Sequence, residues 1–458
     1  MRALKVLLVL VVAAVIGLAV WLYVAPPDLI RVGSGYSAKI VCSNAFLTAR
    51  DPREVLRVDV QAPGHWLLRY MNVSVDRATG VVRAGLFGLF GKGVAVYREG
   101  LGCATVPDGD IDAVRAQPTP KPEEVVAPGE GLWPAGEDVV PVTNEELDAA
   151  LNDPALAGPG MRAIVVVRDG RIVAERYGDG FDAGTRLLGW SMTKSVTSAI
   201  IGRRIREGAL ERDRTKLLPE WTDKRADIAL ADMLGMASDL VWNEGYGSVS
   251  DVTRMLYLEP DMASFAASNP LADPTGESIG KVFNYSSGTT VMLSRVWENT
   301  FADPAEALAY PRKALFGPLG MHSAVLEADA RDTFVGSSYM YATAHDWARF
   351  GHFLAQRGVW EGRSLLPVGY VDWMAEPHPA SHGVYGRGHV WLSPPNTDMP
   401  GPKAELPADA FFMEGHDGQS VSIVPSENLV VVRLGLTPSR EGYKVENLVQ
   451  AVIAALDE

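Results

Sequence analysis

Residues 187–201 read LLGWSMTKSVTSAII, and this stretch decides the fold class. After Lys194, apolar residues recur at helical spacing, and Gly208 is a typical helix terminator. The recurring residues are Val196, Ile200, Ile201 and Ile205. We therefore expect a helix that begins near Ser191, with Lys194 one turn further along. Since positions i and i+3 share one face of a helix, the Lys194 ammonium group is expected beside the Ser191 hydroxyl.

This spacing suits a serine nucleophile. A lysine that is desolvated by apolar neighbours has a lowered pKa and can accept a proton near neutral pH. The free N–H groups at a helix N-terminus favour a developing oxyanion. The alternative is that Ser191 only caps the helix. A second S-x-x-K, from Ser278 to Lys281, lies in a Pro/Gly-rich stretch with no amphipathic helix after it, so the context favours Ser191.

The surrounding sequence predicts strands on both sides of this helix. Residues 164–177 read IVVVRDGRIVAERY, two β-rich runs separated by Arg168-Asp169-Gly170, which indicates a hairpin. Residues 419–424 and 429–434 read as two further strands joined by a turn at 425–428. Periodic patterns become dense from about residue 143, so we expect one large domain over residues 143–458.

The N-terminal 25 residues predict a cytoplasmic tail and a transmembrane anchor. Residues 6–25 carry no charge, and 20 helical residues span about 30 Å, the thickness of a bilayer core. Arg2 and Lys5 precede them, which places the tail in the cytoplasm. The alternative is a cleaved signal peptide, but the apolar stretch is long and no A-x-A-like site follows it. We expect a single-pass protein of the bacterial inner membrane with a periplasmic catalytic domain, exported in either case.

Cys42 and Cys103 are the only cysteines, and both follow the apolar segment. An even number of cysteines in an oxidising compartment favours a disulfide, and two separate buried thiols are the alternative. Alternation such as LRVDV at 56–60 predicts a β-rich region over residues 26–106, in which the glycine-rich run at 85–93 forms a hairpin or loop. The proline-rich segment 107–142 reads as a linker.

Composition excludes several classes of protein. The formal net charge is −14 and the 458 residues contain no Lys/Arg run, so the chain is not expected to bind nucleic acid. The eight histidines show no metal-ligand spacing. A G-x-S-x-G elbow is also missing, because Thr193 stands where its second glycine is required.

Three motifs in order make the chain resemble the serine β-lactamase/penicillin-binding superfamily. They are Ser191-Met-Thr-Lys194, Tyr285-Ser286-Ser287 and His416-Asp417-Gly418. Within it, the chain is similar to the class C β-lactamase-related hydrolases of the 6-aminohexanoate-dimer hydrolase type, as the stretches at 132–137, 236–246, 337–351 and 424–435 also indicate. The resemblance covers about residues 132–458, and residues 26–130 lie outside it.

The resemblance implies an α/β fold in which an antiparallel sheet is flanked by helices. Its strands would come from residues 163–178 and 409–435, and the terminal helix 444–456 would pack on the sheet. A mainly helical region would be inserted between about residues 208 and 345. No metal and no organic cofactor is implied.

The resemblance also assigns roles to the motif residues. Ser191 would attack a carbonyl and form an acyl-enzyme, while Lys194 and the phenol of Tyr285 exchange the proton. The oxyanion hole would consist of the N–H groups of Ser191 and Gln419. Substrate contacts would come from His416, Gly418 and Ser287.

Two departures from the pattern bear on the substrate. Ser287 stands where β-lactamases usually have Asn, and His416 stands where they have Lys, so the fixed positive charge for a β-lactam carboxylate is missing. We therefore expect a hydrolase of small amides or esters. The alternatives are a β-lactamase or DD-peptidase acting on cell-wall material and a non-catalytic penicillin-type sensor. Further candidates for the cleft wall are Asp182, Trp190, Glu244, Tyr246 and Trp391.

Overall fold

The structure is a computed structural model that describes residues 2–120, 129–393 and 405–457. Its central sheet has five antiparallel strands in the order β14-β15-β16-β7-β8. Their bounds are β7 (Met161–Arg168), β8 (Arg171–Tyr177), β14 (Phe411–Gly415), β15 (Gln419–Val424) and β16 (Leu429–Gly435). The hairpin predicted at 164–177 is present, and Asp169 and Gly170 in its turn both have positive φ, as a two-residue hairpin turn requires.

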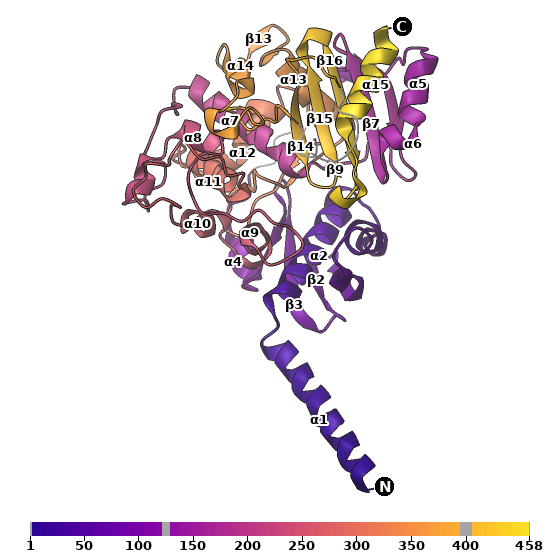
Figure 1. The fold of residues 1–458 in the computed structure, drawn as a ribbon, viewed down its shortest axis with the longest axis vertical. Coiled ribbons are helices and arrows are strands. Elements are labelled where there is room, and N and C mark those ends of the chain that lie inside the picture. The colour runs from indigo at the N-terminus through magenta and orange to yellow at the C-terminus, as the bar shows by residue number, and fades with distance from the viewer. Residues whose placement is uncertain (1, 121–128, 394–404, 458) are drawn as a thin grey trace.

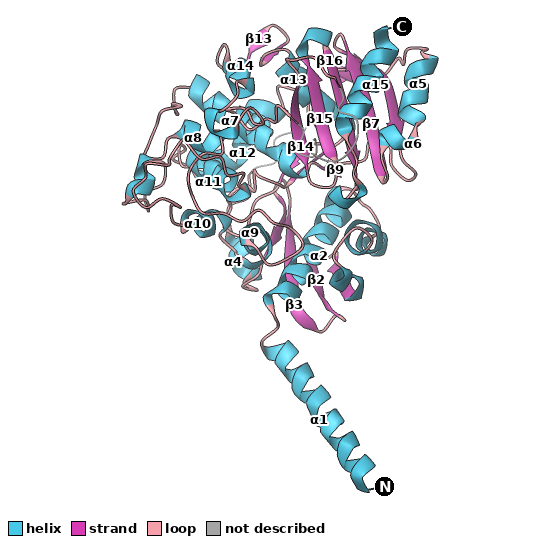
Figure 2. Ribbon diagram, in the orientation of Figure 1, coloured by secondary structure: helices cyan, strands magenta, loops and turns pink. Residues whose placement is uncertain are grey.

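Helices cover both faces of this sheet (Figures 1 and 2). One face packs against α5 (Glu145–Asn152), α6 (Pro154–Ala157) and α15 (Val445–Asp457), and the other packs against α13 (Ala344–Ala355). Alternate residues of β7 supply the two cores: Ile164 and Val166 face α5 and α15, whereas Val165 and Val167 face the opposite side. The predicted α/β fold and the position of the terminal helix are confirmed.

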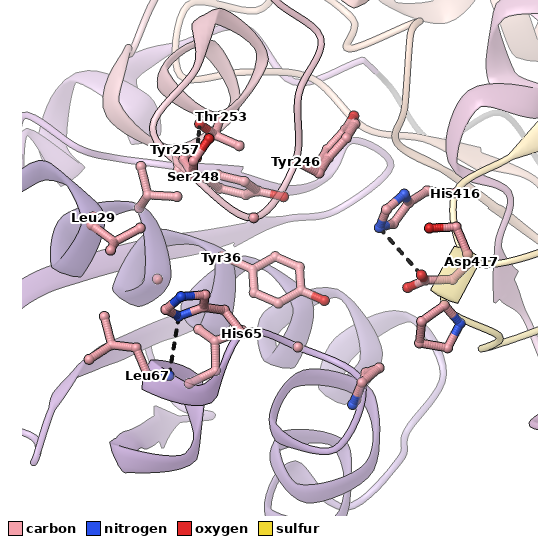
Figure 3. A pocket seen from close by; sticks show the side chains of 18 of the residues that line it. Leu29, Tyr36, His65, Leu67, Tyr246, Ser248, Thr253, Tyr257, His416 and Asp417 are labelled. Carbon is pink, nitrogen blue, oxygen red and sulfur yellow. Dashed lines mark hydrogen bonds and ion pairs between the residues drawn. The ribbon is translucent and has the colours of Figure 1, made fainter. Parts of the chain in front are cut away.

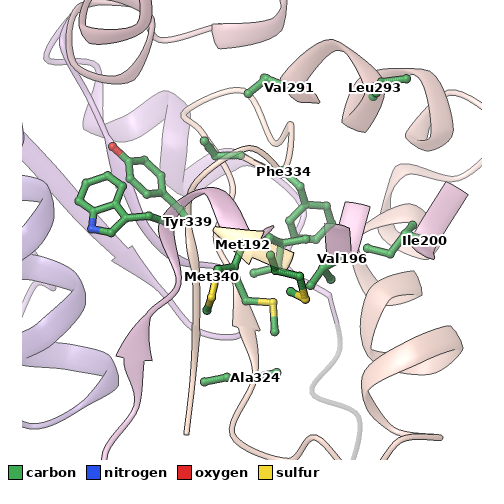
Figure 4. Close-up of a cluster of buried hydrophobic side chains, with 14 of the residues drawn as sticks. Met192, Val196, Ile200, Val291, Leu293, Ala324, Phe334, Tyr339 and Met340 are labelled. Carbon is green, nitrogen blue, oxygen red and sulfur yellow. The ribbon is translucent and has the colours of Figure 1, made fainter. Parts of the chain in front are cut away.

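The region after α7 (Thr193–Arg206) is mainly helical, as predicted. It contains α8 (Leu230–Leu234), α9 (Asp251–Leu258), α10 (Met262–Ala267), α11 (Ser287–Glu298) and α12 (Pro304–Pro311). The short strand β9 (Leu187–Leu188) pairs with β11 (Met340–Ala342), which in turn pairs with β10 (Val325–Leu326). Figure 4 shows the apolar cluster behind this small sheet, where Met192, Val196 and Met340 are fully buried. This cluster fixes the start of α7.

Residues 28–105 form a helix on a four-stranded sheet. The helix α2 (Asp28–Leu47) lies across β1 (Met71–Asp76), β2 (Val81–Leu86), β3 (Phe90–Arg98) and β4 (Gly102–Thr105). The backbones of α2 and β3 come so close that a Cβ at Gly93 would lie 2.3 Å from the carbonyl carbon of Ser34, so only glycine fits there. The glycine-rich run forms the predicted hairpin between β2 and β3.

The prediction of strand at 56–60 is wrong, because residues 56–61 form a π-helical turn. The carboxylate of Asp59 is buried there between the guanidinium groups of Arg50 and Arg162. These ion pairs are tertiary contacts, and local alternation does not report them. The 20-residue helix α2 was likewise not foreseen in a region expected to be β-rich.

The segment between the two parts of the chain includes α4 (Ile111–Ala116), β5 (Gly129–Leu132) and β6 (Gly136–Asp138). Residues 121–128 of the predicted proline-rich linker lie outside the described residues.

Buried ion pairs join the N-terminal part to the rest of the molecule. Lys39 of α2 pairs with Glu327, and Glu327 Oε1 also accepts hydrogen bonds from Ser43 Oγ at 2.8 Å and from the N–H of Cys103 at 2.6 Å. Arg98 of β3 pairs with Asp332 in the same way. Because a buried charge is costly without its partner, these pairs fix how the N-terminal part sits on the part that contains the central sheet.

The helix α1 (Arg2–Val24) projects away from the body (Figure 1). None of its residues is buried, and it is long and apolar enough to cross a membrane. At 1.5 Å per residue, 23 residues extend about 34 Å.

Cys42 of α2 and Cys103 of β4 form a disulfide, as predicted. The bond closes a loop of 61 residues, and loop-closure entropy assigns such a crosslink about 4 kcal/mol. We expect the double variant Cys42→Ala/Cys103→Ala to lower the free energy of unfolding of the N-terminal part by about this amount. Urea denaturation followed by circular dichroism measures it. An unchanged midpoint would show that the disulfide contributes no stability.

Candidate active site

Ser191 lies in a 3-10 turn, Trp190–Met192, that leads directly into α7. Trp190 has φ +47°, a left-handed conformation that is uncommon for a bulky residue and is found where a site requires it. The residue before the turn is tied to β11, because the N–H of Gly189 donates to the carbonyl oxygen of Met340 at 2.9 Å. The small sheet and the strained turn together fix the direction of the Ser191 side chain.

Lys194 is only 1 % exposed, and its Nζ lies 3.0 Å from Ser191 Oγ. The same Nζ donates to Ser287 Oγ and to the carbonyl oxygen of Ser337, each at 3.0 Å. Burial lowers the pKa of Lys194 to about 8, and the negative charge of Glu244 limits the fall. A lysine with this pKa is neutral in an appreciable fraction of molecules at pH 7 and can accept a proton.

Tyr285 is the third predicted catalytic residue, and its hydroxyl forms a hydrogen bond with Ser191. Its ring lies under the Lys194 ammonium group, 4.8 Å from Nζ to the ring centroid. It also contacts the ring of Trp391, with 5.2 Å between the two ring centroids. Burial, and then the charge of Glu244, raise the pKa of Tyr285, while the hydrogen bond with Ser191 opposes the rise. The phenol therefore keeps its proton near neutral pH.

Ser287 is fully buried behind Lys194 and does not face the cavity that contains Ser191. Its Oγ accepts from Lys194 and donates to Glu244 Oε1 at 2.5 Å, and its N–H donates to Glu244 Oε2 at 2.8 Å. Ser287 is thus a positioning residue for Lys194, whereas the resemblance had implied a substrate contact. Trp242 Nε1 holds Glu244 with a further bond of 2.6 Å.

His416 and Gly418 lie in the turn between β14 and β15 and line the same cavity as Ser191. The His416 ring stacks on Tyr246 with 4.6 Å between centroids and meets the edge of Trp190 at 5.7 Å. Its Nε2 lies 3.4 Å from Asp417 Oδ1. The His416 ring is therefore held as part of an aromatic wall.

Gln419, the predicted second oxyanion donor, is not brought to this cavity. It pairs with Gly415 across β14 and β15, and its amide donates to three backbone carbonyls, including that of Gly435 at 2.5 Å. It lines a different, small cavity on the far side of the strand.

The end of β14 takes the place beside Ser191 that Gln419 is expected to take. Phe412 exchanges both backbone hydrogen bonds with Trp391, each at 2.8 Å, on the side away from β15. Backbone direction alternates along a strand, so Glu414 directs its N–H group to that same side, and His416 is the first residue of the turn that follows β14. A Cβ at Gly415 would lie 2.2 Å from the Gly189 carbonyl oxygen, so this strand end runs directly along the Ser191 turn.

The cavity around Ser191 has a volume of about 340 Å³, within the range of small-molecule sites. Of the further candidates, Glu244, Tyr246 and Trp391 line it, Trp190 lines an adjoining cavity, and Asp182 is exposed and bonds to Thr185. Within residues 2–120, 129–393 and 405–457, no cluster of His, Cys, Asp or Glu has the arrangement of a metal site.

Two titratable residues near the site gave no signal in the sequence. His389 is buried, its Nε2 lies 3.1 Å from Thr290 Oγ1, and burial followed by the charge of Lys194 lowers its pKa to about 3. Glu414 lines the cavity, and burial, followed by the charge of Glu446, raises its pKa well above the usual range. Both side chains are placed by the fold, from segments outside any motif.

Comparisons with known proteins agree with this fold. The family model Beta-lactamase matches residues 150–455. No curated protein matches the chain. Among solved structures, a protein described as a 6-aminohexanoate-dimer hydrolase from Bacillus anthracis superposes with a TM-score of 0.55 at 21 % identity, covering 68 % of this chain and 82 % of the other.

Two further structures share the fold. A protein described as a β-lactamase from Bacteroides dorei has a TM-score of 0.53 at 19 % identity, covering 69 % of this chain and 98 % of the other. A penicillin-binding protein from Bacillus halodurans has a TM-score of 0.51 at 18 % identity, covering 68 % of this chain and 99 % of the other.

Proposed function

The chain belongs to the beta-lactamase family, and from that premise we propose that it is a serine hydrolase which cleaves amide or ester bonds of small substrates through an acyl-enzyme on Ser191. The observation that carries this proposal is the 3.0 Å contact between Ser191 Oγ and the buried Lys194 Nζ. A sensor that only binds a ligand has no need for a base at this position.

Lys194 serves as the base in the first step. Neutral Lys194 takes the hydroxyl proton while Ser191 Oγ bonds to the substrate carbonyl carbon. Tyr285 is protonated near neutral pH. Its phenol donates this proton to the leaving nitrogen or oxygen as the bond from that atom to the acyl carbon breaks. It is then reprotonated by the Lys194 ammonium group. In the second half, neutral Lys194 takes a proton from water as the water oxygen bonds to the acyl carbon. The bond to Ser191 Oγ then breaks, and Lys194 returns this proton to Ser191 Oγ as the acid leaves.

The oxyanion is assigned to the N–H groups of Ser191 and His416. Ser191 lies at the start of α7, where N–H groups are free of helical partners. The N–H of His416 is favoured over that of Gln419 because it follows Gly415, the residue in closest approach to the nucleophile turn.

We also propose that α1 anchors the protein in the bacterial inner membrane, with the catalytic part in the periplasm. The apolar helix and the two basic residues before it support this placement.

The pH dependence tests the role of Lys194. Since only the neutral amine accepts a proton, kcat/KM is expected to fall about tenfold per unit below pH 8 and to level off above it. Glu244→Gln removes the negative charge that raises the pKa of Lys194. The inflection in the pH profile of kcat/KM is therefore expected at a lower pH in this variant than in the wild type. A Glu244→Gln profile displaced to higher pH would contradict this assignment.

The substrate class is tested by comparing turnover of p-nitrophenyl acetate, short amides and nitrocefin by the full-length protein. We expect ester and amide hydrolysis with a kcat/KM for nitrocefin at least 100-fold lower than for the ester, because His416 replaces the expected lysine charge. Preferred turnover of nitrocefin would indicate a β-lactamase. Persistent acylation without turnover of any substrate would indicate a sensor.

A further inference from the structure

A second cavity adjoins the one that contains Ser191. Its volume is about 370 Å³, and the two cavities share Tyr246, His416, Asp417 and Ser439 as wall residues. Figure 3 shows Tyr36 in its centre, with Leu29 at one end and His416 at the other. The second cavity therefore lies beside the Ser191 cavity, across the stacked rings of Tyr246 and His416, and extends into the N-terminal part of the chain.

The far end of this cavity is apolar. Its wall is formed by the first turns of α2 and by the 3-10 turn Trp66–Tyr70, which contribute Leu29, Val32, Leu67 and Leu68. The charged side chains of the wall already have partners. Arg440 donates to the carbonyl oxygen of Pro63 at 3.0 Å, and Asp417 faces His416. The far end of the cavity thus offers mainly apolar surface to an occupant.

The apolar end lies next to the proposed membrane anchor. Leu29 follows the end of α1 by five residues, and Lys92 of β3 lies over the ring of Tyr23 near the end of α1, 5.1 Å from its centroid. The 3-10 turn Trp66–Tyr70 and the hairpin between β2 and β3 carry an exposed patch that is mostly aromatic. Trp66, Tyr70, Phe87 and Leu89 are 62 %, 48 %, 56 % and 60 % exposed, and their rings contact one another from Trp66 through Tyr70 to Phe87.

Exposed aromatic clusters beside a membrane helix are typical of an interfacial contact. Trp66 itself stands between His65 and Leu67, which both line the cavity. The aromatic patch therefore adjoins the wall of the cavity at its apolar end.

We propose that this second cavity binds the aliphatic chain of a fatty-acyl ester or amide, which enters from the membrane surface and presents its carbonyl carbon to Ser191. The proposal rests on the proposed function and specifies its substrate class. The acyl chain lies along Tyr36 toward Leu29. Ser191 Oγ bonds to the acyl carbon, the bond to the alcohol or amine breaks and that group takes the proton, and water then releases the fatty acid.

The test uses p-nitrophenyl esters from acetate to dodecanoate with the full-length protein in vesicles of phosphatidylethanolamine and phosphatidylglycerol. We expect kcat/KM to rise at least tenfold from butanoate to dodecanoate, since each buried methylene adds binding. An equal kcat/KM for all chain lengths, with turnover still dependent on Ser191, would overturn this inference and leave the proposed function intact. Absence of Ser191-dependent turnover would instead overturn the proposed function.

Variants separate the cavity from simple partitioning into the vesicle. Leu67→Trp and Leu29→Trp each fill the apolar end, so the ratio of kcat/KM for dodecanoate to that for acetate is expected to fall at least tenfold. Val368→Trp, a matched control at a site that is 94 % exposed, keeps the wild-type ratio. Reaction with a fluorophosphonate shows that each variant is folded. A wild-type ratio in both folded cavity variants would overturn the inference.

The route of entry is tested with Trp66→Ser/Phe87→Ser. This double variant is expected to lower turnover of vesicle-bound dodecanoate at least threefold and to leave its turnover in detergent micelles as in the wild type. An equal effect in both settings, or none in either, would show that the chain enters from solution.

Discussion

Ser191→Ala is expected to lower kcat/KM for p-nitrophenyl acetate by at least 10⁴-fold. The variant loses the hydroxyl that the strained 3-10 turn directs and that is bonded to both Lys194 and Tyr285. Loss of a serine nucleophile costs up to about 10⁶ in kcat in related chemistry, with the remainder due to binding and the oxyanion hole. A stopped assay with a long incubation measures so slow a rate.

The sequence supplies a matched control. Ser278 belongs to the other S-x-x-K of the chain, and its Oγ bonds to Asp273, away from the Ser191 cavity. Ser278→Ala is therefore expected to keep wild-type activity. If Ser191→Ala were to retain more than 1 % of the wild-type rate, or if Ser278→Ala were to lose activity, the nucleophile would be misassigned.

Lys194→Met is expected to lower kcat/KM by 10²- to 10⁴-fold, the usual contribution of an acid–base group. The methionine has nearly the volume of the lysine stem, and it removes a buried charge, so the thermal midpoint should not fall by more than a few degrees. A loss of kcat/KM with a nearly unchanged thermal midpoint would thus report lost catalysis and not lost folding. Tyr285→Phe, which keeps the ring contacts with Trp391, is expected to cost about 10²-fold.

Lys281→Met is the control for this pair, since Lys281 is the exposed lysine of the second S-x-x-K. It should leave both rate and stability unchanged. A Lys194→Met protein that is folded and has more than a tenth of wild-type activity would show that another group takes the Ser191 proton.

The contact between Ser191 and Lys194 could be predicted from sequence because one helical turn separates them, so local geometry alone brings the two side chains together. Tyr285 could be predicted only through the order of three motifs. Its 91-residue separation from Lys194 is closed by the packing of α11 on α7. The β7–β8 hairpin, the β15–β16 pair and α7 could be predicted from period-2 and period-3.6 patterns, whereas the arrangement of helices on the sheet was implied by the family resemblance.

What could not be predicted depends on tertiary geometry. A hairpin turn at His416-Asp417-Gly418 places Gln419 in the paired interior of the sheet, and the sequence does not indicate which residue's N–H points outward. Ser287, which stands where asparagine is expected, links Lys194 through its hydroxyl to Glu244, a residue 43 positions away. The cavity behind His416 arises only when α2 docks on the catalytic part.

Identification of the acylated residue tests the central claim most directly. The full-length protein is mixed with a slowly hydrolysed p-nitrophenyl ester, quenched in acid, digested with trypsin and analysed by tandem mass spectrometry. We predict an acyl adduct on Ser191 within the peptide LLGWSMTK, residues 187–194, which forms and decays at the rates of turnover. An adduct on a different residue, or turnover that proceeds with no adduct on this peptide, would contradict the account.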